Sequence, residues 1–360
     1  MNLPSESLLK KLTVVIISKD RINELENVVN YWLKTSCKLV VIHDSKEPLN
    51  SSYTNENFMY IRSEEPYLNR LAIAENFIAT PYSVICNDDE IFLVDPLLKF
   101  INFLDSDKNI EAVGGQVIAY SWAGNNLLAG NVYPYLQNFL NKNKSSISRI
   151  RNTFETKNIM DITLIYRSGE FKQIIDCCKN FSGFTVPVMG EMMFAFFSSY
   201  YCRSVRLIDV YWMRNWFTPM HNYDKWDRGL TWNDWCRDPK FQGEVRRWII
   251  DFELLLSNKT SISQIESKEI VEYLLNWKSN SGAKVSVKKR TVHARILNAL
   301  KKFIPGSLIW KLKRLLPFTR KYVMPDLKTM LEQQKSAYSI SMDDVERFKL
   351  FAIQQKSLYK

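Results

Sequence analysis

Four consecutive polar residues that include three carboxyl groups, Asn87 to Glu90, are the part of this 360-residue chain best suited to chemistry. They directly follow Tyr82 to Cys86, a short apolar run typical of a strand buried on both faces. Three adjacent carboxylates repel one another, so they are best tolerated in water or around a hard cation such as Mg²⁺ or Mn²⁺. The residues alone leave two interpretations open: a cation site, or a solvated turn in which an Asp caps the next helix.

The elements before this cluster predict a parallel sheet. Residues 12–18 are a β-branched run, 38–43 repeat this pattern, and 58–62 are a third, shorter predicted strand. Amphipathic helices are predicted after Arg21 and around Leu71. The resulting order, β-α-β-loop-β-α-β, favours right-handed crossovers and a largely parallel sheet.

Polar side chains gather where these predicted strands end, and open α/β sheets bind ligands at the carboxyl ends of their strands. The residues concerned are Ser18, Asp20, Asp44, Arg62, Asp88 and Asp89. The segment after the first strand contains no glycine, which excludes the glycine-rich loops of dinucleotide-binding and P-loop proteins.

In this order, the residues resemble a GT-A glycosyltransferase of the family 2 type. The first strand reads VVIISKDR, Asp44 ends the second, Ala74 to Asn76 form an A-x-N helix, and the acidic cluster follows the fourth. The match covers residues 12–120, and the whole chain is similar to a bacterial branch used in surface polysaccharide assembly. The resemblance implies a Rossmann-like GT-A fold of the α/β class with a mostly parallel central sheet, here followed by a basic, helical C-terminal extension.

The resemblance also implies roles for the strand-end residues. Asp44 would contact the base or ribose of a nucleotide-sugar donor, and Asp20 and Arg62 would be further donor contacts. Asp89, with Asp88, would hold a divalent metal (Mn²⁺ or Mg²⁺) on the donor diphosphate. Asn87 departs from the family pattern, because an acid is usual there, so Asp89 is the expected metal ligand.

A second acid, Glu191, precedes the strongly apolar segment 192–201. A carboxylate at the head of a helix is either favoured by the helix dipole or functional beside a cleft. The resemblance implies the second role, because the family carries a Gly-Glu-Asp-like motif whose acid deprotonates the acceptor hydroxyl; Met192 replaces the usual Asp. Partial burial would raise the pKa of such a base toward the working pH, and direct attack would invert the anomeric configuration.

Aromatic residues gather after a predicted strand at 205–214. Tryptophans this dense suit either a sugar-facing wall or an aromatic core under a long loop. His221 is either a metal ligand, as the resemblance implies, or structural. Arg214 is expected to contact the donor diphosphate, and Trp216 and Trp226 to contact the acceptor. The four tryptophans of the segment are Trp216, Trp226, Trp232 and Trp235.

The middle of the chain is less regular. A helix is predicted at 95–107, strands at 112–120 and 161–166, and two helices within 244–280. Residues 121–160 are polar and poorly periodic, which predicts a loop or an acceptor-facing insertion. Arg167 is compatible with a phosphate contact or a surface ion pair.

Charge divides the chain into two regions. Residues 1–283 contain 31 Lys and Arg against 33 Asp and Glu, whereas 284–360 contain 18 against 5. Two basic amphipathic helices predicted within 284–328 would bind an anionic membrane surface; a solvated face is the alternative, and no nucleic-acid motif accompanies the charge.

The predicted organisation is a GT-A domain at 1–240, with a donor half at 10–120 and an acceptor half at 121–240. A helical segment at 241–283 and a membrane-associating tail at 284–360 would follow.

Cysteine spacing and hydropathy indicate a cytoplasmic protein. The six cysteines form no CxxC pair, and neither a signal peptide nor a run long enough to cross a membrane is expected. The predicted protein is therefore an inverting glycosyltransferase, peripheral on the inner face of the plasma membrane, that acts on a saccharide or polyprenyl-linked acceptor and binds no nucleic acid. The alternatives are a sugar-phosphate nucleotidyltransferase, which would normally show a glycine-rich phosphate loop, and a non-catalytic sugar-binding or scaffold protein.

Overall fold

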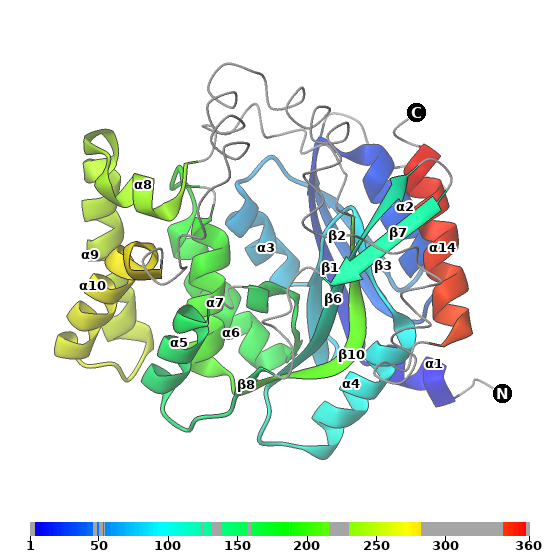
Figure 1. Cartoon of the computed structure of the whole chain (residues 1–360), viewed down its shortest axis with the longest axis horizontal. Coiled ribbons are helices and arrows are strands. Elements are labelled where there is room, and N and C mark those ends of the chain that lie inside the picture. The colour runs from blue at the N-terminus through cyan, green and yellow to red at the C-terminus, as the bar shows by residue number, and fades with distance from the viewer. Residues whose placement is uncertain are drawn as a thin grey trace, which may run out of the picture. The chain divides into compact units, whose positions relative to one another are not determined.

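The chain folds around a central, mostly parallel β-sheet flanked by helices (Figure 1). This computed structural model describes residues 4–45, 49, 53, 55–123, 126–131, 139–156, 160–186, 188–215, 230–281 and 341–357. It confirms the α/β class predicted from the sequence, together with a helix close to the C-terminus.

The strand order of the sheet is β3-β2-β1-β4-β9-β6-β10-β5. Strands β3, β2, β1 and β4 run parallel to one another, and β6 runs parallel to β10. Strand β9 pairs antiparallel with β4 and β6, and β5 pairs antiparallel with β10. The carboxyl ends of the first four strands therefore lie at one edge of the sheet. The bounds are β1 Leu12–Lys19, β2 Lys38–Asp44, β3 Phe58–Arg62, β4 Tyr82–Cys86, β5 Glu90–Phe92, β6 Ala112–Ala123, β9 Ile165–Arg167 and β10 Ser204–Asn215.

Strand β1 shows why this part of the sheet has unbroken apolar runs. Successive side chains of a strand point to opposite faces, and both faces are covered here. Val14 and Ile16 belong to the core under one helical layer, while Val15 and Ile17 are equally buried on the other face.

The two faces are covered by different helices. One core includes side chains of α2 (Ile22–Trp32), α4 (Val94–Ser106) and α14 (Met342–Ser357). On the other face, α3 (Tyr67–Glu75) lies against β1 and β2, and α6 (Ser168–Cys178) lies against β4 and β9. Helix α7 (Met189–Tyr201) contributes Phe194, whose ring contacts Tyr166 and Phe171.

Helix α14 is part of this core although it comes from the far end of the chain. Phe348 and Phe351 are buried, and the Asp344 carboxylate accepts hydrogen bonds from the backbone N–H groups of Val94 (3.0 Å) and Asp95 (2.9 Å), which caps α4. The predicted membrane-associating tail was 284–360, and its residues 284–340 and 358–360 lie outside the described residues, so membrane attachment stays a prediction. Among the helices that the structure does describe, none combines the length and apolarity needed to cross a membrane.

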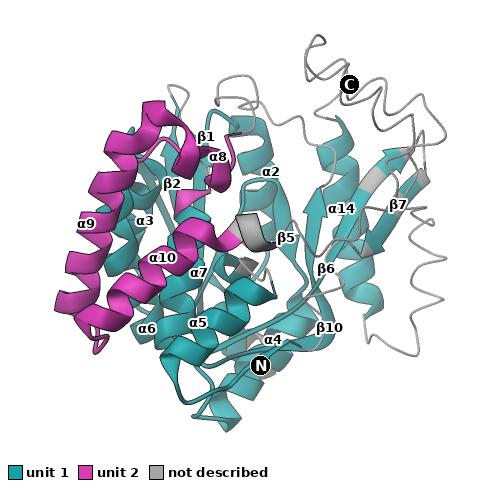
Figure 2. Ribbon diagram, turned by 60° about the vertical axis from the view of Figure 1, so that its left-hand side comes forward, with its two compact units in different colours: residues 1–183, 190–217, 324–360 teal, residues 184–189, 218–323 magenta. Residues whose placement is uncertain are grey.

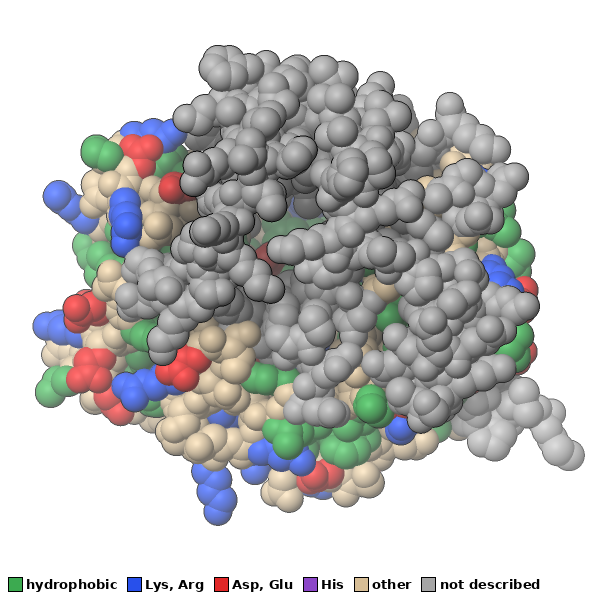
Figure 3. Space-filling model, viewed as in Figure 1, with side chains coloured by type: hydrophobic (Ala, Val, Ile, Leu, Met, Phe, Trp, Pro, Cys, Tyr) green, Lys and Arg blue, Asp and Glu red, His purple; other side chains and the backbone are tan. Residues whose placement is uncertain are grey.

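The chain divides into two compact units (Figure 2). Unit 1 comprises residues 1–183, 190–217 and 324–360 and contains the sheet; unit 2 comprises 184–189 and 218–323. Within unit 2, α8 (Trp232–Arg237), α9 (Gln242–Lys259) and α10 (Gln264–Ser281) surround buried Trp232, Trp235 and Trp248. Charged side chains of both signs are interspersed over these helices (Figure 3).

Two predictions for the middle of unit 1 were wrong. Residues 121–160 contain β7 (Asn126–Asn131), β8 (Leu140–Asn141) and α5 (Ser146–Glu155) rather than an irregular loop. Residues 160–163 form the 3-10 helix η2, so the strand expected at 161–166 is reduced to Ile165–Arg167. The last two residues of that run, Ile165 and Tyr166, still pair with β6.

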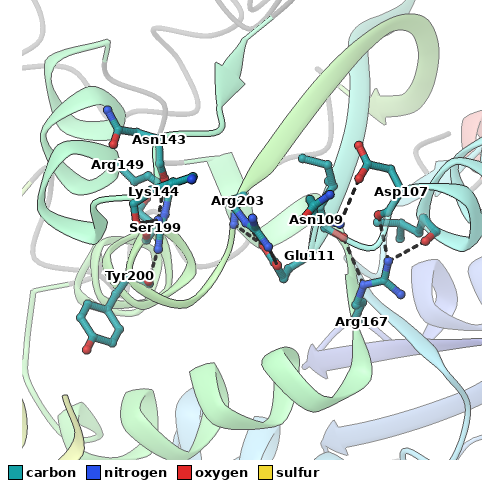
Figure 4. A network of polar contacts seen from close by, with 12 residues as sticks. Asp107, Asn109, Glu111, Asn143, Lys144, Arg149, Arg167, Ser199, Tyr200 and Arg203 are labelled. Carbon is teal, nitrogen blue, oxygen red and sulfur yellow. Dashed lines mark hydrogen bonds and ion pairs between the residues drawn. The ribbon is translucent and has the colours of Figure 1, made fainter. Parts of the chain in front are cut away.

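A polar network joins the ends of several elements in unit 1 (Figure 4). Arg167 donates to backbone carbonyls at and beyond the end of α4, those of Leu104 (2.5 Å), Asp107 (3.1 Å) and Ile110 (3.1 Å). Arg203 pairs with Glu111 at 2.6 Å, just before β10 and β6 begin. These bonds give Arg167 a structural role at the edge where β6 and β10 start, in place of the phosphate contact considered from the sequence.

A buried acid, Asp161, makes stability depend on pH. Burial raises its pKa to about 6 from an ordinary value of 3.8, although Arg206 lies 3.6 Å away and favours the charged form. The folded state therefore holds this proton more tightly than the unfolded state, and stability falls as pH rises from about 4 to about 6. In urea melts, Asp161→Asn should gain stability relative to wild type across that interval, by about 2–3 kcal/mol. A pH-independent difference between the two proteins would contradict this assignment.

Candidate functional site

The four residues Asn87 to Glu90, here called the acidic turn, connect β4 to β5 at the carboxyl end of β4. Asp88 is buried and accepts a hydrogen bond from the Ser18 hydroxyl at the end of β1 (Oγ to Oδ2, 2.8 Å). Arg21 reaches across from the start of α2: its Nη1 lies 2.7 Å from Asp88 Oδ1 and its Nη2 lies 2.9 Å from Asp89 Oδ2. One guanidinium thus bridges both aspartates.

The charge states in the acidic turn follow from this arrangement. Burial raises the pKa of Asp88 to about 7, against the lowering influence of Arg21. Burial also lowers the pKa of Arg21, but the attraction of Asp89 and Asp88 outweighs this effect and leaves the pKa above its ordinary value, so the guanidinium stays charged.

Glu90 points away from this pair. Its Oε2 accepts hydrogen bonds from Asn87 Nδ2 (2.6 Å) and Trp212 Nε1 (2.8 Å), and its Oε1 lies 3.1 Å from Arg214 Nε. Burial raises the pKa of Glu90 to about 7, while Arg214 acts in the opposite direction. Arg214, predicted as a diphosphate contact, is therefore joined to the acidic turn through Glu90.

The ends of β1, β2 and β3 bring three other predicted residues to the same edge. The backbone N–H of Asp20 donates to the Asp44 carbonyl (3.0 Å), and the φ of Asp20 is 53°, a left-handed conformation that Asp adopts more readily than most residues. The Asp44 carboxylate is nearly buried and pairs with Lys19 at 2.5 Å. Arg62 is exposed, ends β3 and is the register partner of His43 on β2.

Arg70 is a site residue that the sequence interpretation missed. It lies on α3, is only 4% exposed, and donates from Nη1 to the backbone carbonyl of Ser18. Within the described structure, its Nε has no hydrogen-bond partner. Burial lowers the pKa of Arg70, and the charges of Asp44 and Asp88 act in the opposite direction. A buried cation that makes no ion pair in the described structure is an arrangement suited to binding an anion.

Glu191 and Asp88 are both close enough to Tyr67 for their charges to affect its hydroxyl. Gly190 packs against Tyr67 and Leu68, at the start of α3, with a Cβ placed on Gly190 coming 3.7 Å from the Tyr67 ring. Burial raises the pKa of the Tyr67 hydroxyl, and the charges of Glu191 and Asp88 both add to that shift. Glu191 itself is exposed, so the partial burial expected for it was wrong; Met192, in place of the family's usual Asp, is fully buried.

The remaining predicted residues belong to the core of unit 2 or lie outside the described residues. Trp216, Trp226 and His221 lie outside the described residues. Trp232 and Trp235 have rings 5.1 Å apart in the core of unit 2, so for these two the aromatic core, rather than a sugar-facing wall, is the correct interpretation.

Comparison with known proteins finds similarity in structure only. No family model matches the chain, and no curated protein sequence does. Staphylococcus aureus TarS 1-349 is 12% identical, with a TM-score of 0.47 over 80% of this chain and 78% of that chain. Its complex with UDP-GlcNAc gives 11% and 0.47 over 96% and 91%. A 2-C-methyl-D-erythritol 4-phosphate cytidylyltransferase of Francisella tularensis gives 10% and 0.31 over 55% and 89%. Likeness at this level assigns no function.

The acidic turn does not have the donor set of a metal centre. Arg21 and Ser18 contact three of the four carboxylate oxygens with which Asp88 and Asp89 could hold a divalent cation. Within the described part of the chain, no three His, Cys, Asp or Glu side chains are placed to share a metal ion. Asp89 as a metal ligand therefore stays a prediction that the described residues do not fit, and His221 lies outside them.

Proposed function

We propose that this chain is a glycosyltransferase that moves a sugar, with inversion, from a nucleotide-sugar donor to a saccharide or lipid-linked saccharide in bacterial surface polysaccharide synthesis. The observation that carries the proposal is the convergence of Asp44, Asp88, Asp89 and Arg70 at one edge of the sheet, near Glu191. Acids that can contact a nucleoside, a buried cation that can meet a diphosphate, and a carboxylate base are the groups this reaction needs.

The donor would lie across the carboxyl ends of β1 to β4. The Asp44 carboxylate accepts hydrogen bonds, so it can bind ribose hydroxyls or a base N–H group. Arg70 and Arg62 supply positive charge for the diphosphate, whose departure they assist by stabilising the charge that develops on it. Arg70 is held in place before the donor arrives, because it is buried and bonded to the Ser18 carbonyl.

Glu191 would act as the base for the acceptor. An acceptor hydroxyl oxygen attacks the anomeric carbon while the bond from that carbon to the diphosphate oxygen breaks. The hydroxyl proton passes to the Glu191 carboxylate, and the nucleoside diphosphate leaves with the bonding electrons. One displacement of this kind inverts the anomeric centre. Glu191 lies in the first turn of α7 and is exposed.

Asp44→Ala tests the donor site. Loss of a charged hydrogen-bond acceptor should weaken nucleoside diphosphate binding by about tenfold or more. We expect nucleoside diphosphates to raise the melting temperature of the wild type, and to raise it much less in this variant, because stabilisation follows occupancy. Removing the Lys19 pairing should cost little stability, since that lysine is half exposed.

The matched control is Asp105→Ala. Asp105 also pairs with a lysine, Lys11, at 2.7 Å, but it lies near the end of α4, where its Oδ1 accepts the Tyr82 hydroxyl. The control should keep the wild-type response to nucleotide. An equal response in all three proteins would reject Asp44 as a donor contact, and binding without any release of nucleoside diphosphate from sugar nucleotides would instead favour a sugar-binding scaffold.

A further inference from the structure

The bridge that Arg21 makes between Asp88 and Asp89 has the geometry of a cation site already filled. The two terminal nitrogens of the guanidinium contact one carboxylate each, at 2.7 and 2.9 Å. The three side chains are only 17%, 8% and 14% exposed, so water screens these charges weakly. A single guanidinium group is thus paired with the carboxyl groups of both Asp88 and Asp89.

The backbone and neighbouring side chains hold Arg21 in this position. Its carbonyl accepts the N–H of Leu25 at 2.9 Å, in the first turn of α2, and its Nε lies 3.9 Å from the Glu24 carboxylate. Asp88 is fixed from the other side by the Ser18 hydroxyl. The bridge is therefore built from β1, α2 and the acidic turn together.

A divalent cation held by both Asp88 and Asp89 would have to displace Arg21. It would need the Asp88 and Asp89 oxygens at 2.0–2.2 Å, roughly the distance at which Mg²⁺ binds oxygen ligands. The guanidinium would then be left beside a second positive charge, in a region with little exposure to water and without its two partners.

We propose that Arg21 takes the place of a divalent cation at the acidic turn, so that this chain binds its nucleotide donor without a divalent metal. This inference rests on the proposed function for the identity of the ligand. The diphosphate would meet Arg70 and Arg62 instead of a metal ion, and Arg21 would keep Asp88 and Asp89 from repelling it.

Thermal unfolding with Mn²⁺ alone tests the first half of the proposal. Millimolar Mn²⁺ should leave the melting temperature of the wild type unchanged. Arg21→Gln should melt at a lower temperature than wild type, because two largely buried carboxylates lose their cation, and Mn²⁺ should restore part of the loss by binding them. Lys19→Gln is the matched control: it removes a neighbouring cation from Asp44 and should show no response to Mn²⁺.

Nucleotide affinity tests the second half. The Kd of a nucleoside diphosphate for the wild type should differ by less than about threefold between EDTA and Mn²⁺, whereas Arg21→Gln should show a metal dependence of about fivefold or more. Wild-type binding that requires Mn²⁺ would overturn the inference and leave the proposed function intact. Failure to bind nucleotides under any condition would reject the proposed function, and the Mn²⁺ melts of the wild type would still decide the role of Arg21. If Arg21→Gln does not fold, these wild-type measurements still test whether Arg21 takes the place of a divalent cation.

Discussion

Glu191→Gln should lower the rate of nucleoside diphosphate release from sugar nucleotides by about 10²–10⁴-fold, the usual contribution of a general base. The amide has the same shape as the carboxylate but cannot accept the proton of an attacking hydroxyl or water. Because Glu191 is exposed, the change should leave folding intact. The Kd of the nucleoside diphosphate should change by less than about twofold, since the lost interaction belongs to the transition state. Rates from purified protein, with donor affinity measured in parallel, check both parts.

Glu170→Gln is the control for this experiment. Glu170 also lies in the first turn of a helix, α6, so its substitution reproduces any loss of interaction with a helix dipole. It should leave the release rate close to that of the wild type. If Glu191→Gln kept most of the wild-type rate, Glu191 would be a dipole-stabilising residue and the base would have to be sought elsewhere.

Phe348→Ala should reduce the free energy of unfolding by about 3–5 kcal/mol, as expected for truncating a buried aromatic side chain. Phe348 is 1% exposed, and its ring meets that of Tyr120, on β6, edge to face at 4.9 Å. Removing it leaves a cavity between α14 and the sheet that the surrounding backbone can fill only in part. Urea denaturation followed by tryptophan fluorescence measures the effect.

Leu350→Ala supplies the comparison on the same helix. Leu350 is 60% exposed, so its truncation should change stability by less than about 0.5 kcal/mol. Similar small effects from both variants would mean that α14 docks weakly, and that it belongs with the preceding basic segment rather than with unit 1.

The sequence predicted the first half of the sheet well because three of its four strands, β1, β2 and β4, are buried on both faces; the edge strand β3 is partly exposed. Residues 12–18, 38–43, 58–62 and 82–86 were expected as strands, and β1 to β4 extend them by at most one residue. Such strands are continuous apolar runs, and a polar residue marks the point where each leaves the sheet. Helix α4, strands β6 and β10 and helices α9 and α10 were also predicted.

Elements whose burial depends on distant partners were predicted poorly. The segment at 161–166 is as apolar as a strand, but Asp161 pairs with Arg206 from β10, and the chain there forms the 3-10 helix η2. Helix α14 was interpreted as part of a basic tail because its charges lie in a basic region, whereas its apolar side chains fit the surface of α2 and β6. No local pattern carries that complementarity.

For the candidate site, the polar residues at the strand ends could be identified from the sequence: Asp20, Asp44, Arg62, Asp88 and Asp89. The order of strands and helices along the chain follows from local hydrophobic pattern and predicts a parallel sheet, so the common edge of these residues could also be predicted. The contacts between charged side chains, in contrast, depend on tertiary packing. Arg21 and Arg70 come from helices α2 and α3, and their bonds to Asp88, Asp89 and the Ser18 carbonyl depend on how those helices pack. Ion pairing at a few ångströms is set by packing rather than by sequence spacing, which is why the contacts of Arg21 with Asp88 and Asp89 could not be predicted.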